Sequence, residues 1–130
     1  MFSQNAFEIS VAATTAYPSS STGAQELLVG GQLALNLEIE NQALTDMNGF
    51  KIQMKDHANG EWYDFITNTE IAAGVADNFL FLSGTLPSAT PAGSKTHMHI
   101  RATACKFMRF LPKLASSTGT VMIRGSKISL

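Results

Sequence analysis

Apolar and polar residues alternate with a period of two along much of this chain of 130 residues. In the clearest run, four apolar positions are separated by mostly polar ones: Gln32, Leu33, Ala34, Leu35, Asn36, Leu37, Glu38, Ile39 and Glu40. Residues two apart in an extended strand point to the same side of a sheet, so this run predicts a strand with one buried face. Residues 7–11 and 50–55 alternate in the same way and predict two more strands.

A β-hairpin is predicted over residues 51–66. Asn59 and Gly60, a pair able to take positive φ, lie between two strand-like runs. Further strands are predicted at residues 79–82, 96–103, 106–111 and 120–124, and an edge strand is predicted at residues 128–130. Pro112 and the Ser/Thr/Gly turn at residues 116–119 are expected to separate the strands that flank them.

Helical signals are weak. Residues 24–29 predict either one turn of helix or the start of a strand, and residues 68–78 predict a short helix that Gly74 weakens. The connections at residues 17–23 and 86–94 are rich in Pro, Ser, Thr and Gly and are long for a domain of this size. Long loops often carry contacts to partners or ligands such as glycans, so we expect contacts there.

These patterns predict an all-β fold. About eight strands with short connections and little helix indicate an antiparallel β-sandwich of the jelly-roll or Greek-key type. The length fits a single domain over residues 1–130, and the single Cys105 excludes an internal disulfide. Residues 1–8 do not resemble a secretory signal, and no apolar run is long enough to span a bilayer. We therefore expect synthesis in a cytoplasm and no membrane partner.

Acidic and basic residues are separated along the chain. All ten acids lie at or before Asp77, where only Lys51 and Lys55 are basic, so residues 1–77 carry a net charge of −8. Residues 78–130 carry seven bases and no acid, a net charge of +7. Only 15% of all residues are charged, against about 25% in an average soluble domain, which suits a protein that buries much of its surface in an assembly.

Two arrangements of these charges are possible. Strands from the two halves can interleave, so that Glu38 or Glu61 faces Arg101 or Arg124 and the charges cancel within the chain. Alternatively, the basic half forms a docking face for an acidic protein neighbour, because complementary surfaces steer association. The candidate contact residues are Lys95, Arg101, Lys106, Arg109, Lys113, Arg124, Lys127, Glu38 and Glu40.

Three histidines are the candidate metal ligands. His97 and His99 lie two apart on a predicted strand and so project from one face, which is a common way to offer two imidazoles to a divalent cation. A site would also need His57, from the hairpin turn, or an acid such as Asp56 or Asp64. Without such convergence these histidines line a polar or intersubunit surface. We expect no metal and no other cofactor.

No residue pattern predicts catalysis. Cys105 is a lone cysteine, of a kind that usually packs in a core, and there is no Gly-x-Ser-x-Gly turn of the hydrolase type. Gly30 and Gly31 precede a strand instead of opening a helix, so they do not predict a phosphate-binding loop. We expect a protein that is not an enzyme.

Aromatic residues mark two possible binding surfaces. Bases and rings interleave over residues 106–110, but alternation places Phe110 on one face and Phe107 on the other, so they cannot form one stacking surface for nucleic acid. We therefore expect no direct contact with nucleic acid. Trp62, Tyr63 and Phe65 beside the hairpin turn form either a shelf for carbohydrate or the packing of the hairpin end.

Several segments resemble a family of phage proteins. Residues 48–55 and 57–65, the Lys-Phe-Met-Arg-Phe run at 106–110, and the turn and strand at 117–125 are similar to segments of small all-β structural proteins of tailed bacteriophage virions. The resemblance implies a non-enzymatic virion component at the capsid surface. It further implies a capsid decoration or cement protein that bridges capsid subunits, often as a trimer, with the major capsid protein or another virion protein as its partner. A tail or adaptor component would have similar features.

Overall fold

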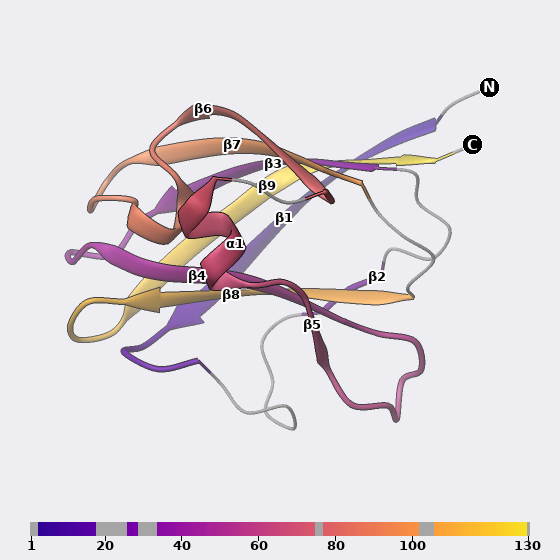
Figure 1. Cartoon of the computed structure of the whole chain (residues 1–130), viewed down its shortest axis with the longest axis horizontal. Coiled ribbons are helices and arrows are strands. Elements are labelled where there is room, and N and C mark those ends of the chain that lie inside the picture. Colours follow the sequence, from indigo (N-terminus) through magenta and orange to yellow (C-terminus); the bar gives the residue numbers. More distant parts are fainter. Residues whose placement is uncertain (1–2, 18–25, 29–33, 75–76, 102–105, 130) are drawn as a thin grey trace.

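The computed structural model describes residues 3–17, 26–28, 34–74, 77–101 and 106–129 (Figure 1). Two helical segments are short, α1 (Asn68–Ala73) and the 3-10 helix η1 (Pro87–Ala89). The strands are β1 (Ser3–Ala13), β2 (Glu26–Leu28), β3 (Ala34–Asn41), β4 (Met47–Lys55), β5 (Tyr63–Ile66), β6 (Phe79–Gly84), β7 (Lys95–Arg101), β8 (Phe107–Leu114) and β9 (Gly119–Ser129). Among the described residues, no helix is long and apolar enough to cross a membrane.

Two antiparallel sheets form the fold. A five-stranded sheet has the order β1-β9-β3-β7-β6, and a four-stranded sheet has the order β2-β8-β4-β5. Figure 1 shows the two sheets as separate layers, with the ends of β1 and β9 side by side near the chain termini. The prediction of an all-β antiparallel sandwich is confirmed.

The pairing of strands is nested. The first strand pairs with the last, β1 with β9, and moving inward β2 pairs with β8, β3 with β7 and β4 with β5. Folding a long antiparallel ribbon over in this way produces a jelly roll, one of the two types that the sequence predicts. β6 is an addition to this pattern, because it extends the five-stranded sheet beyond β7.

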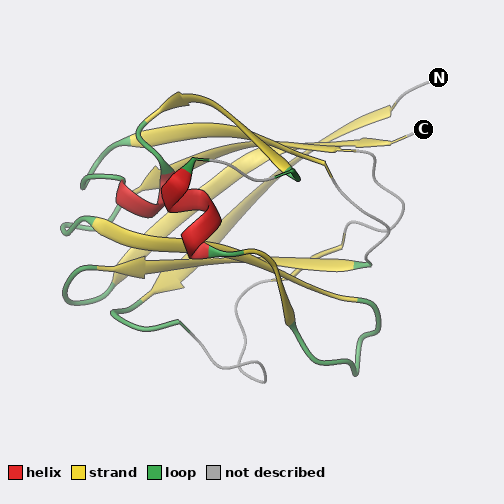
Figure 2. Cartoon of the chain, viewed as in Figure 1, coloured by secondary structure: helices red, strands yellow, loops and turns green. Residues whose placement is uncertain are grey.

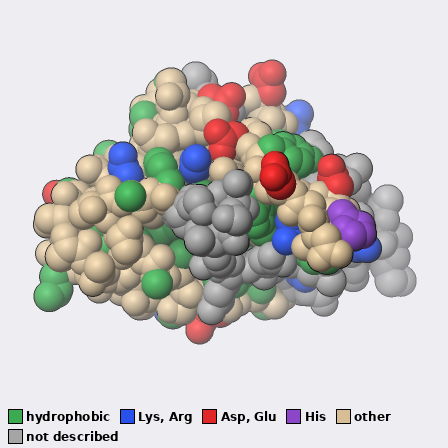
Figure 3. Space-filling view, turned by 90° about the horizontal axis from the view of Figure 1, so that it is seen from below, with side chains coloured by type: hydrophobic (Ala, Val, Ile, Leu, Met, Phe, Trp, Pro, Cys, Tyr) green, Lys and Arg blue, Asp and Glu red, His purple; other side chains and the backbone are tan. Residues whose placement is uncertain are grey.

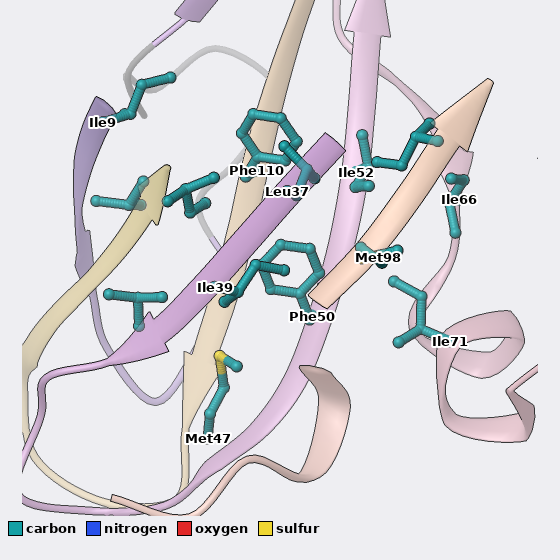
Figure 4. Close-up of a cluster of buried hydrophobic side chains, with 14 of the residues drawn as sticks. Ile9, Leu37, Ile39, Met47, Phe50, Ile52, Ile66, Ile71, Met98 and Phe110 are labelled. Atoms are coloured by element: carbon teal, nitrogen blue, oxygen red, sulfur yellow. The ribbon is translucent and has the colours of Figure 1, made fainter. Parts of the chain in front are cut away.

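The core lies between the sheets. Alternation in β3 buries Leu35, Leu37 and Ile39, as the sequence predicts. The rings of Phe50 and Phe110 stack with centroids 6.4 Å apart and come from neighbouring strands of the opposite sheet. Figure 4 shows side chains from both sheets meeting in this layer.

The short helix α1 has well-defined ends. Thr67 caps its first turn, because its hydroxyl accepts a hydrogen bond from the Glu70 amide while the Glu70 carboxylate accepts one from the Thr67 amide. Gly74 takes a left-handed conformation with φ of 75° and terminates the helix. The predicted helix is therefore present but ends at Ala73. Figure 2 shows α1 and η1 together at one side of the sandwich, where α1 contacts β4 and η1.

Two predicted boundaries are wrong. Pro112 lies inside β8 opposite Phe50 and does not end the strand. β2 pairs with β8 only up to Arg109, so beyond that point one side of β8 has no paired strand among the described residues, and there a missing N–H breaks no ladder bond. Of the predicted edge strand at 128–130, the described residues Ile128 and Ser129 are instead the end of β9, and Ile128 pairs with both β1 and β3.

The hairpin over residues 51–66 is present, but its turn is not the predicted one. β4 and β5 pair in antiparallel fashion, and the Gly60 amide donates to the His57 carbonyl over 2.9 Å. Neither Asn59 nor Gly60 takes positive φ. A loop that spans residues 56–62 is long enough to reverse the chain without the tight turn that requires such angles.

Other predictions fall partly outside the described residues. Of residues 24–29, the structure describes only Glu26–Leu28, and these form the strand β2, one of the two predicted alternatives. Cys105, residues 102–103 and most of the 17–23 loop lie outside the described part of the chain. The 86–94 loop is described and contains η1.

Candidate functional site: the outer face of the five-stranded sheet

A row of polar side chains crosses the outer face of the five-stranded sheet. Because Leu37 and Met98 point into the core, their neighbours Glu38 on β3 and His97 on β7 point outward. The strand register places residues from all five strands directly opposite one another in the order β1, β9, β3, β7, β6. We call this set the polar row: Glu8, Arg124, Glu38, His97 and Ser83.

Each neighbouring pair in the polar row is bonded. Arg124 Nε donates to Glu8 over 2.7 Å, and Arg124 Nη1 donates to Glu38 over 3.4 Å. The His97 ring connects Glu38 to Ser83. Its Nε2 lies 3.2 Å from Glu38 Oε2, and its Nδ1 lies 3.0 Å from the Ser83 hydroxyl. The polar row therefore ties the two edge strands together through the middle of the sheet.

Two further residues join this network. Lys95 Nζ lies 3.7 Å from Glu38 and 3.8 Å from Glu40, and Arg124 Nη1 donates to Glu40 over 3.1 Å. Hydrogen bonds from Gln42 and then Arg124 lower the pKa of Glu40, and bonds to Glu8 and then Glu40 raise the pKa of Arg124. Both shifts favour the charged forms of these groups.

The network explains much of the charge separation in the sequence. Nested pairing places the early strands β1 and β3, which carry Glu8, Glu38 and Glu40, beside the late strands β7 and β9, which carry Lys95 and Arg124. The predicted pairing of Glu38 with Arg124 across neighbouring strands is confirmed. Among these residues, three acids pair with two bases within one molecule, which leaves a single negative charge.

The remaining candidate contact residues do not share one face. Arg109 is fully buried, whereas Arg101 and Lys106 are exposed. Lys113 and Lys127 are half-buried, and the ammonium of Lys113 lies 5.2 Å from the centre of the Tyr17 ring. On the side shown in Figure 3, acidic and basic side chains are interspersed among the residues drawn in colour. A role for the exposed residues in docking stays a prediction.

The histidines are not brought together with a third metal ligand. His97 and His99 share the outer face with Arg101, as predicted, but His99 Nδ1 is 2.7 Å from the amide oxygen of Asn36. His57 remains in the β4–β5 loop, where its ring accepts from the Asn59 amide. Within the described ranges, no three His, Cys, Asp or Glu side chains lie close enough to hold a metal ion.

Sequence reasoning missed that Ser83, His97 and Glu38 are bonded in the order of a hydroxyl–imidazole–carboxylate relay. Strand register, which is not readable from local pattern, produces it. Glu38 also pairs with Arg124 and Lys95, so its carboxylate is not dedicated to His97. Ser83 is exposed on an edge strand, where water is not excluded. Cross-strand pairing explains this arrangement better than catalysis does.

The outer face of the four-stranded sheet holds a buried cation. Arg109 donates to Gln53 Oε1 from Nε over 2.9 Å and from Nη2 over 2.7 Å. Gln53 in turn donates to Asp64 over 2.8 Å, and this bond lowers the pKa of Asp64, with burial opposing it. The chain of bonds joins β8, β4 and β5, and its burial could not be inferred from an outward strand position.

Trp62 packs against this buried cation. Its ring centre lies 4.7 Å from the Arg109 guanidinium and 4.7 Å from the Lys55 ammonium. Tyr63 is 43% exposed and its hydroxyl donates to Asp56 over 3.2 Å. Of the two interpretations of these aromatic residues, the contacts favour packing of the hairpin end over a carbohydrate shelf.

Tyr17 provides a pH-dependent prediction. Its hydroxyl occupies the space that a side chain at Gly49 would fill and has no hydrogen-bond partner among the described residues. Burial, followed by the negative charge of Asp64, raises the pKa of Tyr17 to about 12 from 10.0. The folded state therefore resists ionisation of Tyr17, and its stability falls as pH rises from 10.0 towards about 12.

The ultraviolet absorbance of phenolate during a pH titration measures this ionisation. The difference between wild type and Tyr17→Phe isolates the Tyr17 transition, which we expect near pH 12. A Tyr17 transition near pH 10.0 would show that the ring is solvated in solution.

No known protein family matches the sequence, and no curated protein sequence matches it. The fold itself is a jelly roll with solved counterparts. The crystal structure of SPBc2 prophage-derived protein YomS is similar over 99% of this chain and 96% of that chain, with a TM-score of 0.54 and 15% sequence identity. This similarity shows a shared fold.

A chain of the cyanophage Pam1 capsid asymmetric unit is also similar, over 99% of this chain and 86% of that chain. Its TM-score is 0.43 and its sequence identity is 16%. A score this low supports no conclusion about a common fold or role.

Proposed function

We propose that this protein is a non-enzymatic structural component of a phage virion, and specifically a capsid decoration protein that bridges capsid subunits as a homo-oligomer. The observation that carries the proposal is the jelly-roll fold shared over 99% of the chain with a prophage-derived protein. The resemblance of residues 48–55, 57–65, 106–110 and 117–125 to phage structural proteins supports the same role. Its partner would be the major capsid protein or another virion protein at the capsid surface.

The surface chemistry supports docking over catalysis. The polar row and Lys95 pair within one molecule, so most charges of the five-stranded sheet need no partner to be stable. A decoration protein needs this property, because it must fold before it meets the shell. Arg101 and Lys106 remain as exposed cations for contact with an acidic neighbour.

The test is addition of the purified protein to cognate particles that lack it. We expect saturable binding to the capsid and a higher temperature of DNA release, because a ligand that binds only the intact shell stabilises it. Binding should weaken as salt is raised if exposed charges contribute. A protein that neither binds nor stabilises such particles is not a decoration protein. Labelled antibodies that mark the tail alone in electron micrographs would indicate a tail or adaptor component instead.

Matched variants test the exposed cations. Arg101→Ala and Lys106→Ala are expected to weaken particle binding, most strongly at low salt. Lys95→Ala is the matched control. It also removes one positive charge, but this charge already pairs with Glu38 and Glu40 within the molecule. Equal losses in all three variants would show that net charge, and not a contact at Arg101 or Lys106, controls binding.

A further inference from the structure

Two exposed leucines lie on the edge strand β6. Leu80 is 60% exposed and Leu82 is 53% exposed, which makes them two of the four large apolar side chains exposed among the described residues. Leu80 is opposite His99 in the strand register, and Leu82 lines a shallow depression together with His97, so both leucines lie on the outer face. β6 contains no charged residue from Phe79 to Gly84. Natural edge strands are protected by charge, proline or a bulge, and β6 has neither charge nor proline but does contain a bulge at Leu82.

Polar groups beside the leucines are already bonded within the molecule. Ser83 bonds to His97, and His99 bonds to Asn36. A partner that covers Leu80 and Leu82 would therefore leave neither histidine newly unpaired. An apolar centre with a satisfied polar rim is the usual composition of a protein interface.

We propose that β6 is a two-fold contact between two copies of this chain. The run Leu80-Phe81-Leu82 reads the same in both directions about Phe81. Antiparallel packing centred on Phe81 places Leu80 of one copy against Leu82 of the other, and the reverse contact follows by symmetry. A surface that matches itself in this way meets the requirement for an isologous dimer.

Electrostatics permits this contact. The titratable side chains nearest to the two leucines are His97, His99 and Arg101 on β7, one strand away from the edge, and Asp77, which precedes β6 and lines a hollow with Leu80, His99 and Arg101. In the dimer, the two β7 strands are separated by three inter-strand spacings, roughly 14 Å in all. This distance exceeds the screening length of about 8 Å at physiological salt, so like charges of the two copies repel weakly.

A bulge limits the strength of the contact. The pairing of β6 with β7 shifts between Phe81 and Ser83, which leaves Leu82 as the extra residue. The bulge shortens the regular edge, so leucine contact contributes more than ladder hydrogen bonds. An interface built on one short strand buries less than about 1,200 Å², and we expect a dissociation constant of about 10 µM or weaker.

Sedimentation velocity over a concentration series tests the dimer. We expect wild type to change from monomer to dimer as concentration rises. The double variant Leu80→Lys/Leu82→Lys should weaken association at least tenfold, since four like charges then meet at the axis. Leu44→Lys is the matched control, because Leu44 is 98% exposed and lies outside β6. Thermal unfolding confirms that the variants are folded.

A second double variant tests the register. In Leu80→Lys/Leu82→Glu, each new lysine faces a glutamate of the other copy, so dimerisation should return and become sensitive to salt. The proposal is overturned if wild type stays monomeric, or if it forms a trimer that the β6 variants leave intact. It is also overturned if Leu44→Lys weakens association equally, or if both double variants weaken it equally. These measurements need no particle, so they are independent of the proposed virion role.

Discussion

Replacement of Arg109 by alanine is expected to lower the free energy of unfolding by about 2–4 kcal/mol. The side chain is 0% exposed and makes two hydrogen bonds to Gln53. Its removal leaves the Gln53 carbonyl without these donors and opens space beneath the Trp62 ring, which lies 4.7 Å from the guanidinium. Equilibrium unfolding in urea, followed by Trp62 fluorescence, measures the change.

Two variants define what Arg109 contributes. Arg109→Lys keeps the positive charge but loses the planar fork that bonds twice to Gln53, so we expect it to be destabilised as well. Arg101→Ala removes an exposed arginine and should change stability by less than about 0.5 kcal/mol. An Arg109→Ala protein as stable as Arg101→Ala would mean that the guanidinium is solvated in solution.

The burial of Arg109 also shows where sequence reasoning stops. Alternation correctly places it on the opposite face of β8 from Phe110, and such positions usually face solvent. The burial of Arg109 depends on Trp62, which is far away in the sequence. The loop between β4 and β5 places the Trp62 ring against the guanidinium. The alternation of apolar and polar residues within one strand does not show which distant side chain packs over its outer face.

Strand existence, by contrast, could be predicted from the sequence. In β3 and β7 one face is buried and the other is not, so period-two alternation is strong and the predicted strands are found. Boundaries were less predictable because they depend on neighbours. Pro112 fits inside β8 where, among the described residues, no strand pairs on one side beyond Arg109, and Ile128 is central because β1 and β3 both extend far enough to pair with it.

The polar row could be predicted only with knowledge of the strand topology. The sequence shows acids early and bases late, and both internal pairing and a basic docking face are consistent with that order. Nested pairing of first with last strands selects internal pairing for Glu8, Glu38, Lys95 and Arg124. The pairing of β6 with β7, which lies outside this nested pattern, brings Ser83 to His97, a contact that no sequence motif marks.

Phe110→Ala is expected to have the largest effect on stability, about 3–5 kcal/mol. Phe110 is fully buried and stacks on Phe50, so truncation removes apolar contacts from both sheets and leaves a cavity between them. Phe107 lies on the opposite face of β8 and is half-buried, so Phe107→Ala should cost only about 1 kcal/mol. Urea midpoints for the two variants measure the difference. Equal losses would show that the alternation of β8 does not decide which of its rings supports the fold.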